Sequence, residues 1–200
     1  ALKGDNVVHK SENMPWYDGT ALLHHLENVN IGASRNLVDF RFPVQMALRP
    51  NQNFRGFAGQ IASGSIKPGD EVVVLPSGKS SLVRSIVTVE KELAEAAEGD
   101  SITLTLEDEI DISRGDMIVR KRNLPRVASR FECIISWMSE EPLDPKGSYI
   151  VQHTTRQVRA FISELNYRID VNTLHREDAD TLNLNEIGRV TLTTTKPLYY

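Results

Sequence analysis

Alternating apolar and polar positions dominate the chain from about residue 40 onward. The clearest case is the run from residue 101 to 106, where Ile102, Leu104 and Leu106 alternate with Thr103 and Thr105. This period of two is typical of a β-strand with one buried face. Further runs of strand character cover residues 42–48, 57–62, 71–75, 82–89, 117–119, 129–137, 149–153, 157–169 and 189–195. Many short strands at this spacing predict an all-β barrel or sandwich.

Turn residues separate most of these runs. Pro68-Gly69 suits a type II turn, and Gly78-Lys79 predicts a hairpin turn between two strands. Residues 90–98 are rich in Glu and Ala, which favour helices, so one or two helical turns are expected there. Residues 170–185 are polar and acidic, which predicts a long loop or a weak strand.

The N-terminal part follows a different pattern. Residues 1–35 are irregular except for one short helix, for which Thr20 is the expected N-cap. Leu22, Leu23 and Leu26 fall on one helical stripe, and the helix is expected to end near residues 30–32.

These elements divide the chain into three regions. We predict a helix-containing linker and domain tail at 1–35, a small β-barrel at 36–122, and a second small β-barrel at 123–200 that packs on the first. Pro125 biases Leu124 toward an extended conformation, so a hinge is expected near Asn123-Leu124-Pro125. The second region, at roughly 75 residues, is near the lower size for an independent fold.

Composition narrows the possible functions. The 200 residues carry a net charge of −4, which argues against a general nucleic-acid binder. The single cysteine, Cys133, excludes a disulfide framework and a cysteine-based zinc site, and indicates a reducing, cytoplasmic compartment. No apolar run approaches the ~18 residues of a membrane span, so no membrane association is expected. The missing initiator methionine favours a segment from within a longer protein.

No catalytic or metal-binding set is predicted. Gly78-Lys79-Ser80 lacks the glycine that a phosphate loop requires five residues earlier, where Val73 stands. Asp144-Pro145-Lys146-Gly147 matches the short D-x-x-G element of GTPases, but Pro145 favours an ordinary turn. The adjacent histidines His24 and His25 diverge by ~100° on a helix and are poorly placed to share a metal.

Three charged segments remain as candidates for contacts with a partner. The acidic stretch Glu107, Asp108, Glu109 and Asp111 is read as a solvated loop or a docking surface, because calcium-loop spacing is absent. The run Arg120–Arg126 is better explained as a linker with solvated charges than as a phosphate contact.

The segment with Phe54, Arg55 and Phe57 is read as barrel packing or as a contact edge, since arginine and aromatic residues are enriched at interface hot spots. We therefore expect Arg55, Phe57, Glu107, Asp108 and Glu109 to bind a partner, and expect loss of Arg55 and Phe57 to leave stability nearly unchanged.

Longer strings in the sequence resemble a known family. Residues 13–20 resemble the segment that leaves the GTPase domain in eukaryotic-type elongation factors, and residues 59–72 resemble the second-domain signature of that elongation-factor-Tu-like superfamily. Three further strings, at 54–59, 106–116 and 185–198, are similar to the GTPase-type large subunit of sulfate adenylyltransferase, or ATP sulfurylase.

This resemblance implies that the chain comprises non-catalytic domains two and three of a regulatory GTPase subunit, with the second barrel shorter than the family's third domain. In that family GTP hydrolysis drives adenylyl sulfate synthesis from ATP and sulfate by a small adenylyltransferase subunit, the implied partner. GTP and magnesium would bind a domain preceding Ala1, and only Ala1 and Leu2 match the edge of its guanine site. The alternative is a pair of barrel domains that contact tRNA or the ribosome in an elongation-factor-like GTPase, although the acidic 106–116 stretch opposes RNA binding.

Overall fold

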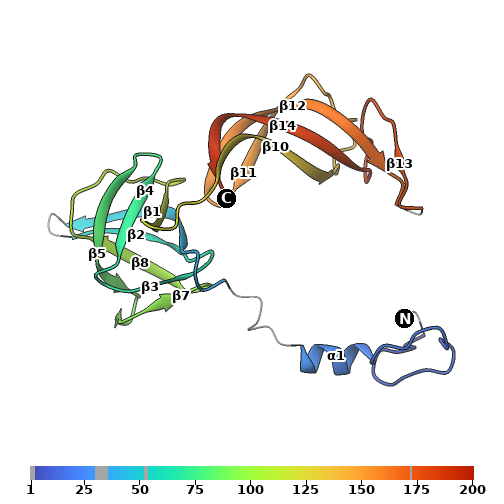
Figure 1. Ribbon diagram of the computed structural model, residues 1–200, viewed down its shortest axis with the longest axis horizontal. Coiled ribbons are helices and arrows are strands. Elements are labelled where there is room, and N and C mark those ends of the chain that lie inside the picture. Colours follow the sequence, from blue (N-terminus) through green and yellow to red (C-terminus); the bar gives the residue numbers. More distant parts are fainter. Residues whose placement is uncertain (1–2, 30–35, 52–53, 172) are drawn as a thin grey trace. The chain divides into compact units, whose positions relative to one another are not determined.

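The computed structural model describes residues 3–29, 36–51, 54–171 and 173–200 (Figure 1). The chain divides into two compact units, Ala1–Asn36 and Leu37–Tyr200. The second unit holds the β-strands, which confirms the predicted all-β class.

The N-terminal unit contains one short helix, α1 (Leu22–Asn28). Its N-cap position is Ala21, which supplies no side-chain cap, so the prediction of Thr20 as the cap is wrong. The first amides of the helix are satisfied by main-chain oxygens instead, because Leu22 N donates to Asn6 O at 2.9 Å and Leu23 N to Val7 O at 2.8 Å. The predicted helix end at 30–32 lies outside the described residues. In the described parts of the chain, no helix is long and apolar enough to cross a bilayer.

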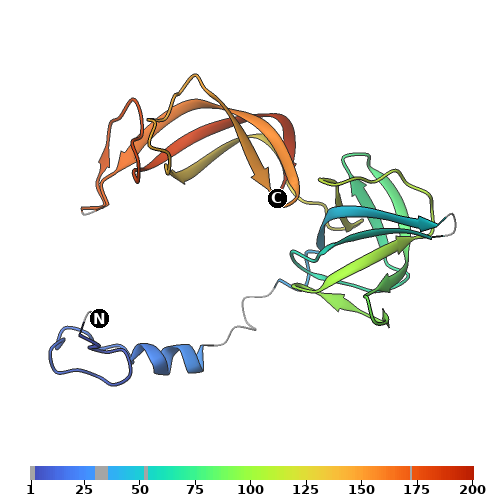
Figure 2. The ribbon, with the colours of Figure 1, turned by 180° about the vertical axis from the view of Figure 1, so that it is seen from behind.

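Six strands of the second unit close into a barrel, seen from behind in Figure 2. They are β1 (Arg41–Asn51), β2 (Phe54–Gln60), β4 (Glu71–Leu75), β5 (Lys79–Val87), β8 (Ser101–Leu106) and β9 (Met117–Arg120). Their order is β4-β9-β1-β2-β8-β5, and the pairing of β4 with β5 completes the ring. The interior is filled by alternating apolar side chains, including Phe42, Phe57, Ile86, Leu104 and Ile118. Closure pairs the strand edges that would otherwise be exposed.

Two short strands occupy the segment predicted as helical. β6 (Glu92–Leu93) pairs with β5, and β7 (Ala96–Ala97) pairs with β3 (Ser65–Ile66). The helical expectation for 90–98 is therefore wrong. Leu93 packs against the barrel core and Ala96 is buried within it, so tertiary burial outweighs a weak local helical preference.

The remaining strands form a second antiparallel sheet. Its order is β10 (Val127–Ser136), β14 (Ile187–Tyr199), β12 (Arg156–Ile169) and β11 (Ser148–His153), with β13 (Arg176–Glu177) paired to β12. Register shifts in β10–β14 and β12–β14 mark irregularities that bend such long strands. Leu143, Ile162, Leu182 and Val190 form its core.

The barrel and this sheet make direct contacts within the unit Leu37–Tyr200. Val73, Met117 and Val119 of the barrel form a buried cluster with Tyr199 of β14. Immediately after the connector, Arg126 and Tyr200 exchange two main-chain hydrogen bonds, of 2.8 and 3.0 Å. The two regions thus share a small apolar interface. The domain boundaries predicted at 35/36 and 122/123 stay predictions.

Candidate functional site

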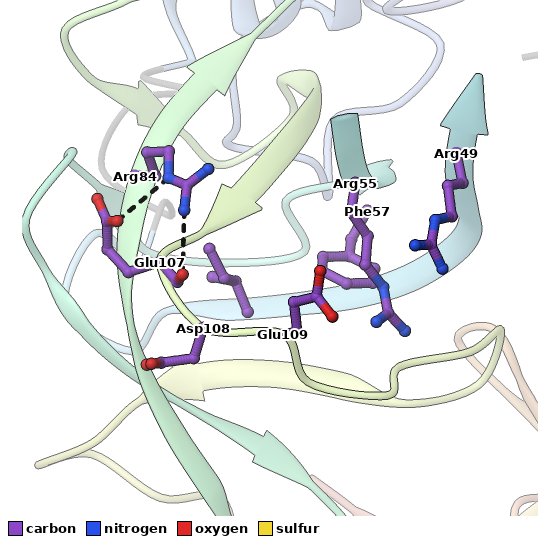
Figure 3. Close-up of a pocket in the computed structure, with 8 residues that line it drawn as sticks. Arg49, Arg55, Phe57, Arg84, Glu107, Asp108 and Glu109 are labelled. Carbon is purple, nitrogen blue, oxygen red and sulfur yellow. Dashed lines mark hydrogen bonds and ion pairs between the residues drawn. The ribbon is translucent and has the colours of Figure 1, made fainter. Parts of the chain in front are cut away.

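A charged pocket lies where strands β1, β2 and β8 meet at one end of the barrel (Figure 3). Its cavity measures about 80 Å³. The lining combines three arginines, three acidic residues and two apolar side chains: Arg49, Arg55, Phe57, Arg84, Leu106, Glu107, Asp108 and Glu109. All five residues predicted to bind a partner therefore line one pocket, together with Arg49 and Arg84, which the sequence did not single out.

Strand register brings these distant positions together. The β1–β2 pairing sets Asn51 opposite Phe54, so Arg49 and Arg55 come from the two arms of one hairpin. In the β2–β8 pairing Phe57 lies opposite Leu104, and in the β5–β8 pairing Val83 lies opposite Leu106. The acidic loop that begins at Glu107 therefore leaves β8 beside the side chain of Arg84.

Arg55 is held in place from two sides. Its Nη2 lies 3.1 Å from Asp111 Oδ1, and its guanidinium stands 5.8 Å from the ring centroid of Phe57, a cation–π arrangement. Phe57 itself is 1% exposed and belongs to the barrel core. For Phe57 this burial favours the packing interpretation, and it argues against the expectation that loss of the side chain leaves stability nearly unchanged.

The acidic loop is anchored by two further contacts. Arg84 donates through Nε to Glu107 Oε2 at 3.2 Å and through Nη2 to Glu107 O at 3.0 Å. Ser81 Oγ donates to Asp108 Oδ2 at 2.9 Å and accepts from Asp108 N at 3.1 Å. These bonds fix the backbone of the loop, and Asp108 is turned toward β5.

Arg49 and Glu109 are the two charges left open. Both are exposed, and within the described ranges neither forms an ion pair or a side-chain hydrogen bond with another described residue. In the view of Figure 3 the Arg55 guanidinium lies between them. The pocket thus presents one positive and one negative group, both exposed to solvent, beside the Arg55–Asp111 ion pair.

This arrangement favours a surface contact over small-molecule chemistry. Drug-sized ligands occupy pockets of roughly 300–1,000 Å³, well above the 80 Å³ found here. Among the described residues no group of three His, Cys, Asp or Glu side chains is placed to hold a metal. The predicted guanine-site residues Ala1 and Leu2 lie outside the described residues.

Comparisons with known proteins first establish the class. The family described as "GTP-eEF1A C-terminal domain-like" matches residues 130–200. Sup35 complexed with GDP superposes with a TM-score of 0.76 at 20% identity, over 98% of this chain and 49% of that one. Elongation factor SelB from Methanococcus maripaludis gives 0.65 at 22% identity, over 90% and 39%. The fold is that of the β-domains of elongation-factor-like proteins.

Curated relatives then identify the family within that class. "Sulfate adenylyltransferase subunit 1" of Bacteroides fragilis is 53% identical over 200 residues, covering 100% of this chain and 42% of the relative. "Bifunctional enzyme CysN/CysC" of Rhodopirellula baltica is 55% identical, covering 100% and 31%. The chain is a homologue of sulfate adenylyltransferase subunit 1 over its whole length, and it spans about two fifths or less of these two relatives.

Proposed function

We propose that this chain forms non-catalytic β-domains of the GTPase-type subunit of ATP sulfurylase and docks the small adenylyltransferase subunit. The observation that carries the proposal is whole-chain identity of 53–55% to the relatives named above. Identity to Sup35 and SelB is only 20–22%, which supports a shared fold but not a shared role. A cytoplasmic location fits the single free thiol, Cys133.

In this proposal the chemistry belongs to other parts of the assembly. GTP and its magnesium bind a GTPase domain outside the 200 residues, and the small subunit transfers the adenylyl group of ATP to sulfate. The β-domains link the two and transmit the nucleotide state of the first to the second. The apolar cluster that the two regions share is small, which suits this role, because small interfaces permit relative motion.

The charged pocket is the docking surface we assign to this partner. Arg49 and Glu109 present opposite charges that are free of ion pairs among the described residues, while the Arg55–Asp111 and Arg84–Glu107 pairs pre-order the surroundings. Complementary charges raise the association rate more than the affinity. A modest affinity with clear salt dependence is therefore expected.

Binding measurements distinguish this proposal from the tRNA-contacting alternative. The 200-residue chain is immobilised and exposed to the purified small adenylyltransferase subunit, or to aminoacyl-tRNA, at low and high salt. We expect saturable binding of the small subunit that weakens with salt, and no saturable binding of tRNA. Binding of tRNA without binding of the subunit would overturn the proposal in favour of a translation-factor role.

A further inference from the structure

A second, larger cavity lies within the unit Leu37–Tyr200, between the loop at 113–116 and the β11–β12 hairpin. Its volume is about 460 Å³, and its lining includes Arg114, Thr155, Arg156 and Lys196. None of these residues lines the charged pocket at the other site. The cavity brings three cationic side chains from separate parts of the chain to one place.

Arg156 leaves most of its hydrogen-bonding capacity unused. Its Nη1 donates to Gly115 O at 3.4 Å, which is at the long limit for a hydrogen bond, and its Nε is buried without a partner in the described structure. The guanidinium stands 5.2 Å from the ring centroid of Tyr199, which holds it in place without using its donors. A fixed, planar guanidinium with free donors matches the geometry of an oxyanion.

The adjacent residue, Thr155, also has a buried polar atom without a hydrogen-bond partner in the described structure. Its Oγ1 is buried and, like Arg156 Nε, has no hydrogen-bond partner among the described residues. Native proteins pair nearly all buried polar groups, so these two unpaired groups at the cavity wall are available to a bound molecule. The hairpin tip is also strained, because Thr154, a β-branched residue, has a φ of 53°.

The charge balance of the cavity is positive. Arg114 and Lys196 are exposed, and with the described residues Arg114 makes a single hydrogen bond, of 3.5 Å, to Gln45 O. The one carboxylate in the lining, Asp116, already accepts a hydrogen bond from Ser113 N at 2.9 Å. Three cationic side chains therefore line the cavity with one carboxylate, Asp116, which already accepts a hydrogen bond from its own loop.

We propose that this cavity binds a tetrahedral oxyanion, either free phosphate or sulfate or the phosphate group of a larger molecule. Arg156 provides the principal charge, Arg114 and Lys196 close the rim, and Thr155 Oγ1 donates a further hydrogen bond. The proposal does not depend on the docking function above, because it concerns different residues and a different ligand.

Calorimetric titration of the 200-residue chain tests this site. The probes are inorganic phosphate, sulfate and adenosine monophosphate, each compared with sodium chloride at the same ionic strength. We expect saturable binding of at least one probe, and about tenfold weaker binding in Arg156→Gln, the loss expected for one charge-assisted hydrogen bond. The matched control is Arg159→Gln, an exposed arginine three residues further along β12 that does not line the cavity.

Two rim variants keep the test decisive if Arg156→Gln fails to fold. Arg114→Gln and Lys196→Gln change exposed side chains, and each should also weaken binding while the unfolding midpoint stays unchanged. Binding of phosphate and sulfate supports a site for a free oxyanion, whereas binding of adenosine monophosphate alone supports a site for a phosphate ester. No saturable signal beyond chloride, or equal weakening in Arg159→Gln, would overturn the proposal.

Discussion

The guanidinium of Arg41, in the first strand of the barrel, binds Asn123, which lies 82 positions further along the chain. Nη1 donates to the main-chain oxygen of Asn123 at 2.9 Å, and Nη2 donates to its side-chain oxygen at 3.0 Å. Asn123 Nδ2 in turn donates to Asp39 Oδ1. Burial lowers the pKa of Arg41 below its ordinary value, against the opposing charge of Asp39. The start of the predicted hinge is thereby tied to the barrel.

Replacing Arg41 should measurably destabilise the barrel. Arg41→Gln removes two charge-assisted hydrogen bonds to a half-buried partner, and the free energy of unfolding should fall by about 1.5–3 kcal/mol. Urea unfolding followed by circular dichroism measures the change. Arg159→Gln, an exposed arginine, should stay within about 0.5 kcal/mol of the parent chain. Equal midpoints for the two variants would show that the Arg41–Asn123 contact contributes nothing to stability.

Phe57 should behave as a core residue. Phe57→Ala leaves a cavity in the barrel interior, so stability should fall by about 3–5 kcal/mol. Phe161 is 42% exposed on the second sheet and provides the matched control. Phe161→Ala should cost about 1 kcal/mol or less. Similar losses in both variants would contradict the burial of Phe57.

Local turn chemistry was the most predictable part of the fold. Gly78-Lys79 lies at the β4–β5 hairpin, and Gly78 has a φ of +71°, which a glycine adopts at little cost. Segments decided by distant contacts were not predictable. Residues 90–98 have helix-favouring composition, yet Leu93 pairs with Ile86 and Ala96 pairs with Ile66.

The candidate site could be predicted only in part, for the same reason. The acidic run at Glu107 and the Arg55 segment are visible as local clusters in the sequence. Arg49 and Arg84 are single charges on separate strands, and only the register of β1, β2, β8 and β5 brings them to the pocket. Arg84 is exposed next to the buried Val83, but its local sequence does not indicate which residue of another strand lies beside it.

Gly64 should tolerate no side chain. A Cβ at this position would lie 2.5 Å from Phe40 N and 2.7 Å from the carbonyl carbon of Asp39, and its φ is +79°. Gly64→Ala should therefore lose about 3 kcal/mol or more through strain and overpacking. Gly78 has a similar φ of +71° but no heavy atom within 4 Å, so Gly78→Ala should lose only about 1 kcal/mol. Thermal unfolding of both variants separates backbone strain from steric overlap.

Glu186 should make the second sheet sensitive to acid. A hydrogen bond from Asn183 N at 2.7 Å, reinforced by Arg168, lowers the pKa of Glu186 below its ordinary value of 4.5. A lowered pKa in the folded state stabilises the protein above the unfolded-state pKa, and this stabilisation is lost as pH falls from that value through the folded pKa.

The corresponding measurement is the unfolding midpoint of the parent chain and of Glu186→Gln as a function of pH. The variant should be less stable at neutral pH and should lose less stability on acidification. Glu140→Gln, at an exposed glutamate, should follow the parent curve. If the unfolding midpoint of Glu186→Gln falls at acid pH as steeply as that of the parent chain, protonation of Glu186 is not coupled to unfolding.

The most direct test of the docking proposal is the affinity of charge-reversal variants for the small adenylyltransferase subunit. Arg49→Glu and Glu109→Lys alter exposed side chains that have no ion pair among the described residues, so the unfolding midpoint should not change. Each should weaken binding by at least about tenfold, mainly through slower association at low salt. Glu140→Lys, an equivalent reversal outside the pocket, should bind as the parent chain does. Parent-like affinity in both pocket variants, or equal loss in Glu140→Lys, would contradict the assignment of the charged pocket as the docking surface.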